Sequence, residues 1–305
     1  MIVYLNGEFL PQEEAKVSPT DRGFLFGDGI YEAIPYYKGK PFAFDGHWKR
    51  LQDGLGFLRI DFADHDEEKM KKVFDELLNR NNGLQQMTRA MIYLQITRGA
   101  PPTRSHVFPV SNGTVVKPTV FATCQEIAYP SPERWTAGFS AALVPDQRWG
   151  RVDIKTVNLL ANVLAAQEAK DKGADEAIFV TEDDAHLITE GSKANVFGIL
   201  KDDANGGSKI VTHPLSRQIL PGITRNMVVQ VARNAGLIVE ERAMTRAELT
   251  EEAQEVFITS TTTEIKPIVK IDGKVVGDGK AGPMSTKLVA LLRSQIEVET
   301  GVKLD

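Results

Sequence analysis

One lysine is placed for covalent chemistry, between a predicted strand and a predicted helix. Lys155 follows the short strand-like run 152–154, and a helical pattern begins directly after it and extends to about Lys172. Neighbouring elements hold such a lysine inward, and desolvation favours a neutral amine, which attacks the carbonyl carbon of a cofactor or substrate to form a Schiff base. Taken alone, the same pattern is more typical of an ordinary lysine that starts a helix.

Two segments carry cationic groups that suit an anion. Arg50 lies beside the apolar stripe of a helix predicted over 47–58. It is either a solvated residue whose stem covers the core edge or a clamp for a phosphate or carboxylate. Arg104 and His106 alternate in a proline-containing loop, so an extended backbone would point both toward one carboxylate. Two ordinary solvated loop residues would give the same pattern.

Three further segments place polar groups at the ends of predicted elements. Glu190 stands at a Glu-Gly corner between two predicted strands, either as a surface residue at a bulge or as a carboxylate aimed into a cleft. Gly222 and Thr224 open a predicted helix, whose first N–H groups form an anion site unless Thr224 simply caps them. The strand that begins at 255 continues into five hydroxyl residues, 259–263, which are either strand-favouring residues or a phosphate cradle.

Periodicity and turn signals predict the elements that position these groups. A hairpin is predicted around Asn6-Gly7. The other predicted strands lie at 30–44, 88–99, 115–124, 139–144, 177–181, 187–189, 196–200 and 255–259, and the helices lie at 47–58, 67–81, 155–172, from 220 onward and at 284–297. The proline-rich segment 129–135 is predicted to be a linker. We therefore expect an α/β protein with a small N-terminal α/β domain (1–128) and a larger C-terminal α/β domain (136–305).

Composition limits the possible classes of function. The 305 residues carry a formal net charge of −5 without a basic block, so nucleic acid is an unexpected partner. The single cysteine, Cys124, cannot form an internal disulfide, and the five histidines are scattered, so we expect no metal site. Because the N-terminus lacks a signal-peptide pattern and no apolar run would span a bilayer, we expect a cytoplasmic protein without a membrane partner.

Seven motifs, in their order along the chain, resemble the fold-type-IV pyridoxal-phosphate enzymes, the branched-chain-aminotransferase-like family. They are DRGFLFGDGIYE, HWKRL, RSHVFP, DIKTVNLLANVLA, ITEGSKANVFG, ILPGITR and FITSTTTEI. Within the family the chain is most similar to the D-amino-acid aminotransferases, because the Arg104-x-His106 pair separates that group from the branched-chain enzymes. The resemblance implies two α/β domains with the site in the cleft between them, and a homodimer.

The resemblance also assigns roles at a site for pyridoxal 5'-phosphate. Lys155 would carry the cofactor through an imine bond, and Glu190 would face its pyridine nitrogen. The phosphate and ring would be held by Arg50, Leu220, the Ile223 backbone, Thr224 and Thr261. The residues assigned to the substrate are Tyr31, Arg104, His106 and Thr262. In the similar enzymes, the arginine and the histidine reach in from the partner subunit.

Two departures from the family pattern bear on the substrate range. Ser192-Lys193-Ala194 replaces a serine-rich corner. The loss of a hydroxyl at Ala194 bears on hydrogen bonding near Glu190, and the charge of Lys193 points either to solvent or toward the site. Pro35 stands in a run that is usually rich in valine, where it bears on the shape of the substrate pocket.

The expected reaction is ping-pong transamination between a D-amino acid, such as D-alanine, and a 2-oxo acid, such as 2-oxoglutarate, with Lys155 as the general acid–base. Three alternatives share the fold: a branched-chain L-amino-acid aminotransferase, an (R)-amine aminotransferase and an aminodeoxychorismate lyase. The Arg104-x-His106 loop argues against all three. An alternative of another class is a non-catalytic small-molecule-binding protein, against which the retention of Lys155 and Glu190 argues.

Overall fold

Contacts divide the chain into two compact units in this computed structural model, which describes residues 1–81, 87–111, 114–202 and 206–304. The first unit comprises Met1–Ala128, Ile154–Asn158 and Glu299–Asp305, and the second comprises Tyr129–Asp153 and Leu159–Val298. The segment that carries Lys155 therefore packs with the first unit. The predicted linker, 129–135, includes the start of the short helix α4 (Pro132–Ala137), which Ser131 caps by accepting the Arg134 N–H at 3.2 Å.

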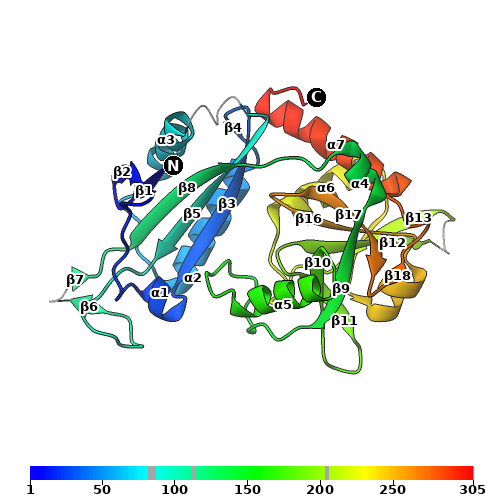
Figure 1. Ribbon diagram of the computed structural model, residues 1–305, viewed down its shortest axis with the longest axis horizontal. Coiled ribbons are helices and arrows are strands. Elements are labelled where there is room, and N and C mark those ends of the chain that lie inside the picture. The colour runs from blue at the N-terminus through cyan, green and yellow to red at the C-terminus, as the bar shows by residue number, and fades with distance from the viewer. Residues whose placement is uncertain (82–86, 112–113, 203–205, 305) are drawn as a thin grey trace. The chain divides into compact units, whose positions relative to one another are not determined.

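The first unit is built on a six-stranded antiparallel sheet with the order β2-β1-β8-β5-β3-β4 (Figure 1). Its strands are β1 (Ile2–Leu5), β2 (Glu8–Pro11), β3 (Gly29–Tyr37), β4 (Lys40–Pro41), β5 (Arg89–Thr97) and β8 (Thr119–Glu126). A separate ribbon joins β6 (Val110–Ser111) to β7 (Thr114–Val115). The helices are α1 (Arg22–Phe26), α2 (Phe44–Leu58) and α3 (Glu67–Arg80). Helix α2 contacts β3, and α3 contacts β1 and β8.

The spacing of apolar residues explains why the two longer helices form and which faces they bury. The residues that α2 buries, Phe44, Trp48, Leu51 and Leu55, recur every three or four positions, which is the period of one helix face. They join the inward residues of β3 and β5 in one core. The predicted hairpin at Asn6-Gly7 is confirmed, because both residues adopt positive φ angles between β1 and β2.

The second unit contains a ten-stranded mixed sheet in the order β14-β13-β12-β16-β17-β9-β10-β11-β15, with β18 paired to β17. Its strands are β9 (Phe139–Pro145), β10 (Glu176–Val180), β11 (Leu187–Gly191), β12 (Asn195–Lys201), β13 (Ser208–Thr212), β14 (Val239–Glu241), β15 (Met244–Thr245), β16 (Glu255–Ser260), β17 (Glu264–Ile271) and β18 (Lys274–Val275). Its helices besides α4 are α5 (Leu160–Asp171), α6 (Ile223–Asn234), the π-helical turn η2 (Glu248–Glu252) and α7 (Pro283–Thr300). Across the described ranges, we find no helix with the length and apolarity that a bilayer crossing requires.

The segment around Lys155 differs from its prediction. Residues 152–154 form turns rather than a strand, and α5 begins at Leu160 rather than directly after the lysine. The large apolar side chains of this helix lie on the surface rather than in the core, with exposed fractions of 68% for Leu160, 60% for Val163 and 62% for Leu164. Helix α5 instead packs on β9 and β10 through the buried Ala165 and Ala169, because small side chains let the helix approach the sheet closely.

Candidate active site

Lys155 is fixed to the start of β3 through the backbone. The Tyr31 N–H donates to the Lys155 carbonyl at 3.0 Å, and the Val157 N–H donates to the Gly29 carbonyl at 3.0 Å. The Lys155 side chain is half-buried, and its Nζ lies 4.2 Å from the centre of the Tyr31 ring. The structure thus brings together two predicted site residues, the amine and the tyrosine, within the first unit.

The tyrosine belongs to one face of the sheet, which it shares with the departure at Pro35. Because side chains alternate along a strand, Tyr31 and Pro35 point to the same side of β3. On the neighbouring β5, Tyr93 stacks on Tyr31 with 5.6 Å between ring centres, and Met91 is paired with Pro35. Burial raises the pKa of Tyr93 to about 12. The proline therefore shapes the face on which Tyr31 stands.

Arg50 is held by a buried carboxylate on the opposite face of β3. Its Nε and Nη2 donate to the two oxygens of Glu32 at 2.7 Å and 2.9 Å, and His47 Nδ1 lies 2.8 Å from Glu32 Oε2. Burial favours the neutral carboxylic acid, but the charges of Arg50 and His47 outweigh it and hold the pKa of Glu32 well below its usual range. Burial in turn lowers the pKa of His47. Glu32 thus orients the predicted phosphate ligand, a role that the sequence did not reveal.

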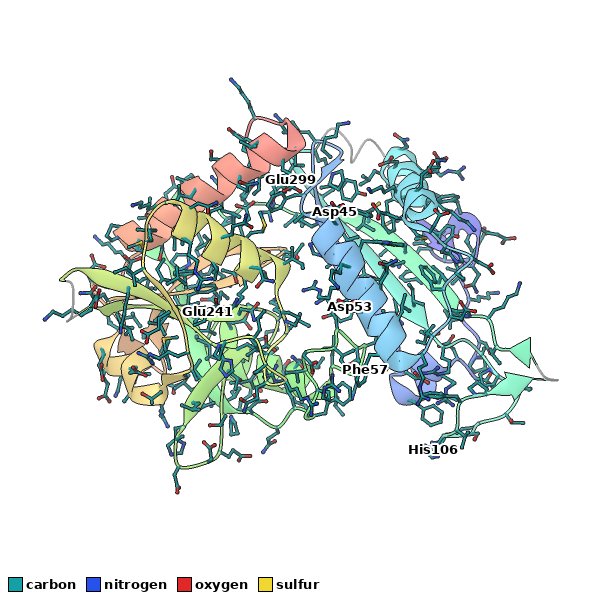
Figure 2. The ribbon with its side chains drawn as sticks, turned by 180° about the vertical axis from the view of Figure 1, so that it is seen from behind. Asp45, Asp53, Phe57, His106, Glu241 and Glu299 are labelled. Carbon is teal, nitrogen blue, oxygen red and sulfur yellow. The ribbon has the colours of Figure 1, made fainter. Side chains whose placement is uncertain are left out.

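Arg104 and His106 meet on one aromatic ring. The Arg104 guanidinium lies 4.7 Å from the centre of the Phe26 ring, and the His106 ring centre lies 5.1 Å from the same point. Both side chains are exposed. Figure 2 shows His106 beyond the end of α2 that carries Phe57. The predicted alternation of the two residues therefore places them side by side, in a loop of the first unit.

In the second unit, Glu190 accepts hydrogen bonds from three residues. Arg148 Nη1 donates to Oε1, while Asn195 Nδ2 and the Leu220 N–H donate to Oε2 at 3.1 Å and 2.9 Å. The carboxylate is buried at the end of β11. Arg148 also forms a two-point ion pair with Asp146, with its Nε and Nη2 at 2.8 Å and 2.7 Å from the carboxylate oxygens. The pairing of β10 with β11 is irregular beside Glu190, as at a bulge, but the glutamate there is a fixed, buried carboxylate and not a surface residue.

The start of α6 lies on a glycine that approaches the residues around Glu190. Gly222 occupies the N-cap position, and no side chain caps the helix. Thr224 therefore does not perform the simple capping that was the alternative to an anion site. A Cβ added to Gly222 would lie 2.0 Å from Oδ1 of Asn195, so only glycine lets the backbone approach this amide. Asn195 also donates to the Leu220 carbonyl at 3.0 Å. Its side-chain amide therefore links Glu190 to the segment that directly precedes α6.

The hydroxyl residues form the tight connection between β16 and β17. Ser260 pairs with Glu264 across the hairpin, and Ser260 Oγ lies 2.8 Å from the Thr263 hydroxyl and 3.3 Å from the Thr262 hydroxyl. Thr261 and Thr262 are half-buried. Thr259, which precedes Ser260 in β16, is paired with Asn195 of β12. The strand register therefore places this turn near the residues that hold Glu190.

The two departures from the family pattern in the corner after Glu190 lie in different surroundings. Lys193 is exposed, whereas Ala194 is buried in the apolar core of the sheet. The Ser192 hydroxyl donates to the buried Glu176, and the Ser192 carbonyl accepts from Asn162 Nδ2 at 2.8 Å. The corner is therefore secured by its first residue and its backbone.

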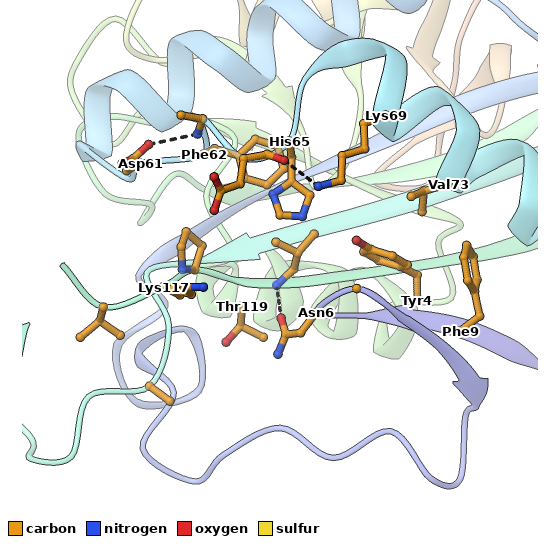
Figure 3. A pocket seen from close by; sticks show the side chains of 17 residues that line it. Tyr4, Asn6, Phe9, Asp61, Phe62, His65, Lys69, Val73, Lys117 and Thr119 are labelled. Atoms are coloured by element: carbon orange, nitrogen blue, oxygen red, sulfur yellow. Dashed lines mark hydrogen bonds between the residues drawn. The ribbon is translucent and has the colours of Figure 1, made fainter. Parts of the chain in front are cut away.

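A broad hollow on the first unit lies apart from these residues (Figure 3). It is lined by the Tyr4 and Phe9 rings, by Phe62 and His65, and by the polar side chains of Lys69 and Asn6 among others. Its polar groups already bond within the chain, since Lys69 donates to the Asp64 carbonyl at 2.7 Å and Asn6 accepts from the Val120 N–H at 2.8 Å. Its lining includes none of the predicted site residues.

The predicted residues described above thus form separate groups within each unit. The first unit joins Lys155 to Tyr31 and, separately, Arg104 to His106. The second unit joins Glu190 to Leu220 and the start of α6. Sequence reasoning missed the partners that fix these groups, among them Glu32 and Arg148. An arginine two residues after an aspartate at the end of β9 was the only sequence signal for Arg148.

Comparison with known proteins places this arrangement in a family. The model of the amino-transferase class IV family matches residues 29–271. The D-alanine aminotransferase of Staphylococcus haemolyticus is 40% identical over 97% of this chain and 98% of its own length, and that of Bacillus licheniformis is 39% identical over 98% and 99%.

Solved structures agree with this placement. The branched-chain amino acid aminotransferase of Escherichia coli has a TM-score of 0.82 and 26% identity, over 100% of this chain and 96% of that one. The T.th. branched-chain amino acid aminotransferase with pyridoxamine 5'-phosphate has a TM-score of 0.80 and 27% identity, over 99% and 95%. The predicted fold class is confirmed, and the chain belongs to the class-IV aminotransferases.

Proposed function

We propose that this protein is a pyridoxal-phosphate-dependent D-amino-acid aminotransferase, which exchanges an amino group between a D-amino acid, such as D-alanine, and a 2-oxo acid, such as 2-oxoglutarate. The observation that carries the proposal is an amine, Lys155, and a buried, hydrogen-bonded carboxylate, Glu190, in a chain 40% identical to a D-alanine aminotransferase. The Arg104 and His106 pair supports a substrate with a carboxylate group.

The described residues fit the cofactor. Arg50, with the uncapped N–H groups at Ile223 and Thr224 of α6, would bind the phosphate, together with Thr261. Glu190, faced by Arg148, would pair with the pyridine nitrogen, and Leu220, tied to Glu190 by its own N–H, would pack on the ring. The glycine at 222, which leaves no room for a Cβ, keeps the backbone at this phosphate end close to the asparagine that holds Glu190.

When bound, the cofactor withdraws electrons from the substrate's Cα–H bond. Lys155, held beside Tyr31, would move the proton from the substrate's Cα to the C4′ carbon of the cofactor in the first half of the ping-pong cycle, and from C4′ to the Cα of the second substrate in the second half. Tyr31, Arg104 and His106 hold the substrate carboxylate, and Thr262 lines the substrate side. The products are a 2-oxo acid and, after the second half, a new D-amino acid.

A homodimer completes this proposal. The loop of Arg104 and His106 is exposed, as are Phe24, Val107 and the outward residues of α5, and apolar surface of this kind marks an interface. We expect Leu164→Glu to lower the apparent mass in analytical ultracentrifugation from dimer to monomer and to lower activity with it. A dimer of unchanged stability in this variant would contradict the use of α5 in the interface. The cytoplasmic location also stays a prediction, which cell fractionation tests.

The test of function is a donor panel of D-amino acids, L-amino acids and (R)-amines, each with 2-oxoglutarate, read as release of the 2-oxo or ketone product. We expect turnover of D-alanine and little of L-leucine, whereas the opposite preference would favour a branched-chain enzyme. Borohydride should attach the cofactor covalently to Lys155, as peptide mapping would show. Lys155→Ala should abolish turnover, and Lys172→Ala, at the exposed end of α5, should leave it unchanged.

A further inference from the structure

The loop that carries Arg104 and His106 is exposed at its side chains but anchored at its backbone. One arginine, Arg22 of α1, supplies the anchor. Its Nη1 donates to the carbonyls of Ser105 and, at 3.5 Å, Val107, and its Nη2 donates to the carbonyl of His106 at 3.3 Å. Three successive carbonyls, centred on the histidine, thus meet a single guanidinium whose planar fork has a fixed geometry.

Arg22 is itself immobilised by a buried ion cluster. Its Nε donates to Asp28 at 2.7 Å, and the same carboxylate accepts two hydrogen bonds from Arg98, at 2.8 Å and 2.9 Å. Arg98 also donates to the carbonyls of Leu58 and Arg59, at the end of α2. The exposed fractions of the three side chains are 4% for Arg22, 12% for Asp28 and 6% for Arg98. The cluster therefore ties the loop to α1, to the end of β5 and to α2.

Electrostatics keeps the central carboxylate charged. Burial by itself raises the pKa of Asp28, but the hydrogen bonds from Arg98 and Arg22 outweigh burial, and the pKa lies below its usual value. A charged acceptor strengthens each of these hydrogen bonds, since charge-assisted bonds are about twice as strong as neutral ones. The anchor thus holds at neutral pH.

Aromatic contacts complete the anchor on both sides of the pair. Phe26 contacts Arg22 as well as Arg104 and His106, because the Arg22 guanidinium lies 4.8 Å from its ring centre. On the other side, the Arg98 guanidinium lies 3.6 Å from the ring centre of Phe108. These aromatic contacts help to fix the spacing of Arg104 and His106 and are not part of the unit's hydrophobic core.

We propose that Arg22, held by Asp28, is a positioning residue that sets the spacing of Arg104 and His106 for the substrate carboxylate. The proposal rests on the proposed function, in which the pair binds that carboxylate. A pair that is held in advance loses less conformational entropy when the substrate binds. Freeing the loop backbone therefore weakens the binding of carboxylate substrates and spares the reaction of nucleophiles that lack a carboxylate.

The test is Arg22→Lys in the cofactor-loaded enzyme. Lysine keeps a positive charge beside Asp28 but cannot reach three carbonyls at once. We expect the KM for D-alanine to rise about tenfold, with kcat within about threefold of the parent value. The rate at which hydroxylamine, which has no carboxylate, reacts with the bound cofactor should not change. Arg89→Lys is the matched control, because Arg89 is equally buried at the start of β5, beside Tyr37.

A second variant and a second readout keep the test decisive. Phe108→Leu removes the ring beneath Arg98 and should raise the same KM by a smaller factor, so it serves if Arg22→Lys does not fold. Hydrogen–deuterium exchange on cofactor-free protein should be faster in residues 100–109 of either variant. An unchanged KM, or equal losses with D-alanine and hydroxylamine, would overturn the proposal. If no D-amino acid is a donor even for the parent, the proposed function fails, and unchanged exchange in the loop would separately refute the anchor.

Discussion

Replacing Arg148 with methionine should destabilise the second unit and weaken its hold on pyridoxal phosphate. Methionine keeps an unbranched apolar stem but leaves two carboxylates, Asp146 and Glu190, facing a buried space without a cation. Loss of one partner of a buried ion pair costs about 3–5 kcal/mol. The value should lie near the lower end, about 3 kcal/mol, because the Thr189 hydroxyl still donates to Asp146 at 2.7 Å, and Asn195 and the Leu220 N–H still donate to Glu190.

The stability lost in Arg148→Met should depend on pH, and the structure determines the direction of this dependence. Burial raises the pKa of Asp146, but the hydrogen bonds and charge of Arg148 outweigh it and lower the pKa below its usual value. A carboxyl with a lowered pKa in the folded state contributes stability above its unfolded pKa of about 3.9, and this stability is lost as the pH falls through the folded value. The difference between the parent and Arg148→Met should therefore be largest near neutral pH and should shrink below about pH 4.

The assay is thermal unfolding of parent and variant between pH 3 and pH 8. A loss of about 3 kcal/mol corresponds to a fall in Tm of roughly 6–12 °C for a unit of this size. Arg233→Met is the control, because its ion pair with Glu241 is half-exposed and should contribute less than about 1 kcal/mol. Retention of pyridoxal phosphate on gel filtration, measured for Arg148→Met, Glu190→Gln and the double variant, should show non-additive losses. A Tm difference that stays constant down to pH 3 would refute the electrostatic argument.

Two further substitutions test the geometry of the proposed phosphate ligands. Glu32→Gln should lower the free energy of unfolding by about 2 kcal/mol at neutral pH, because Arg50 keeps a hydrogen-bond partner but loses its buried counter-charge, and denaturant titration would measure this. Gly222→Ala should lower the affinity for pyridoxal phosphate in a fluorescence titration, because its Cβ would displace the amide of Asn195, whereas Gly56→Ala in α2 meets nothing within 4 Å and should raise the Tm. An equal effect of the two alanines on cofactor affinity would contradict the proposed close approach.

Local patterns predicted elements well where one face of each is buried within its own unit. Helices α2 and α3 follow the spacing of their apolar residues, and the hairpin at Asn6-Gly7 adopts the positive φ angles that such a turn requires. The same argument failed for α5. Periodicity identifies an apolar face, but it does not say whether the molecule's own sheet covers that face, and here the alanines rather than the leucines touch β9 and β10.

The strand prediction for the segment before α5 was wrong for a related reason. Val152 and Ile154 favour strands, yet a strand needs a partner along its length, and the structure gives this segment a single bridge, from Thr156 to Ile30. That bridge and the bond between Tyr31 and the Lys155 carbonyl link residues more than 120 positions apart. Such contacts are fixed by the tertiary fold, so local propensity could not have supplied them.

Residues that are proposed to act on the substrate can be predicted from the sequence more easily than the residues that hold them in place. A group that is proposed to act, such as Lys155, belongs to a motif, DIKTVNLLANVLA, that resembles a known family, and this resemblance is a signal in the sequence itself. A holding group such as Glu32 is only one charged residue within an otherwise ordinary strand. Its role follows from an exposed fraction of only 1% and from two partners on a helix that begins seven residues after β3 ends. Because an uncompensated buried charge costs several kcal/mol, a charged residue inside an apolar strand itself predicts a partner of opposite charge. Applied to Arg22 on the short helix α1, the same rule leads to Asp28 and, through it, to the loop of Arg104 and His106.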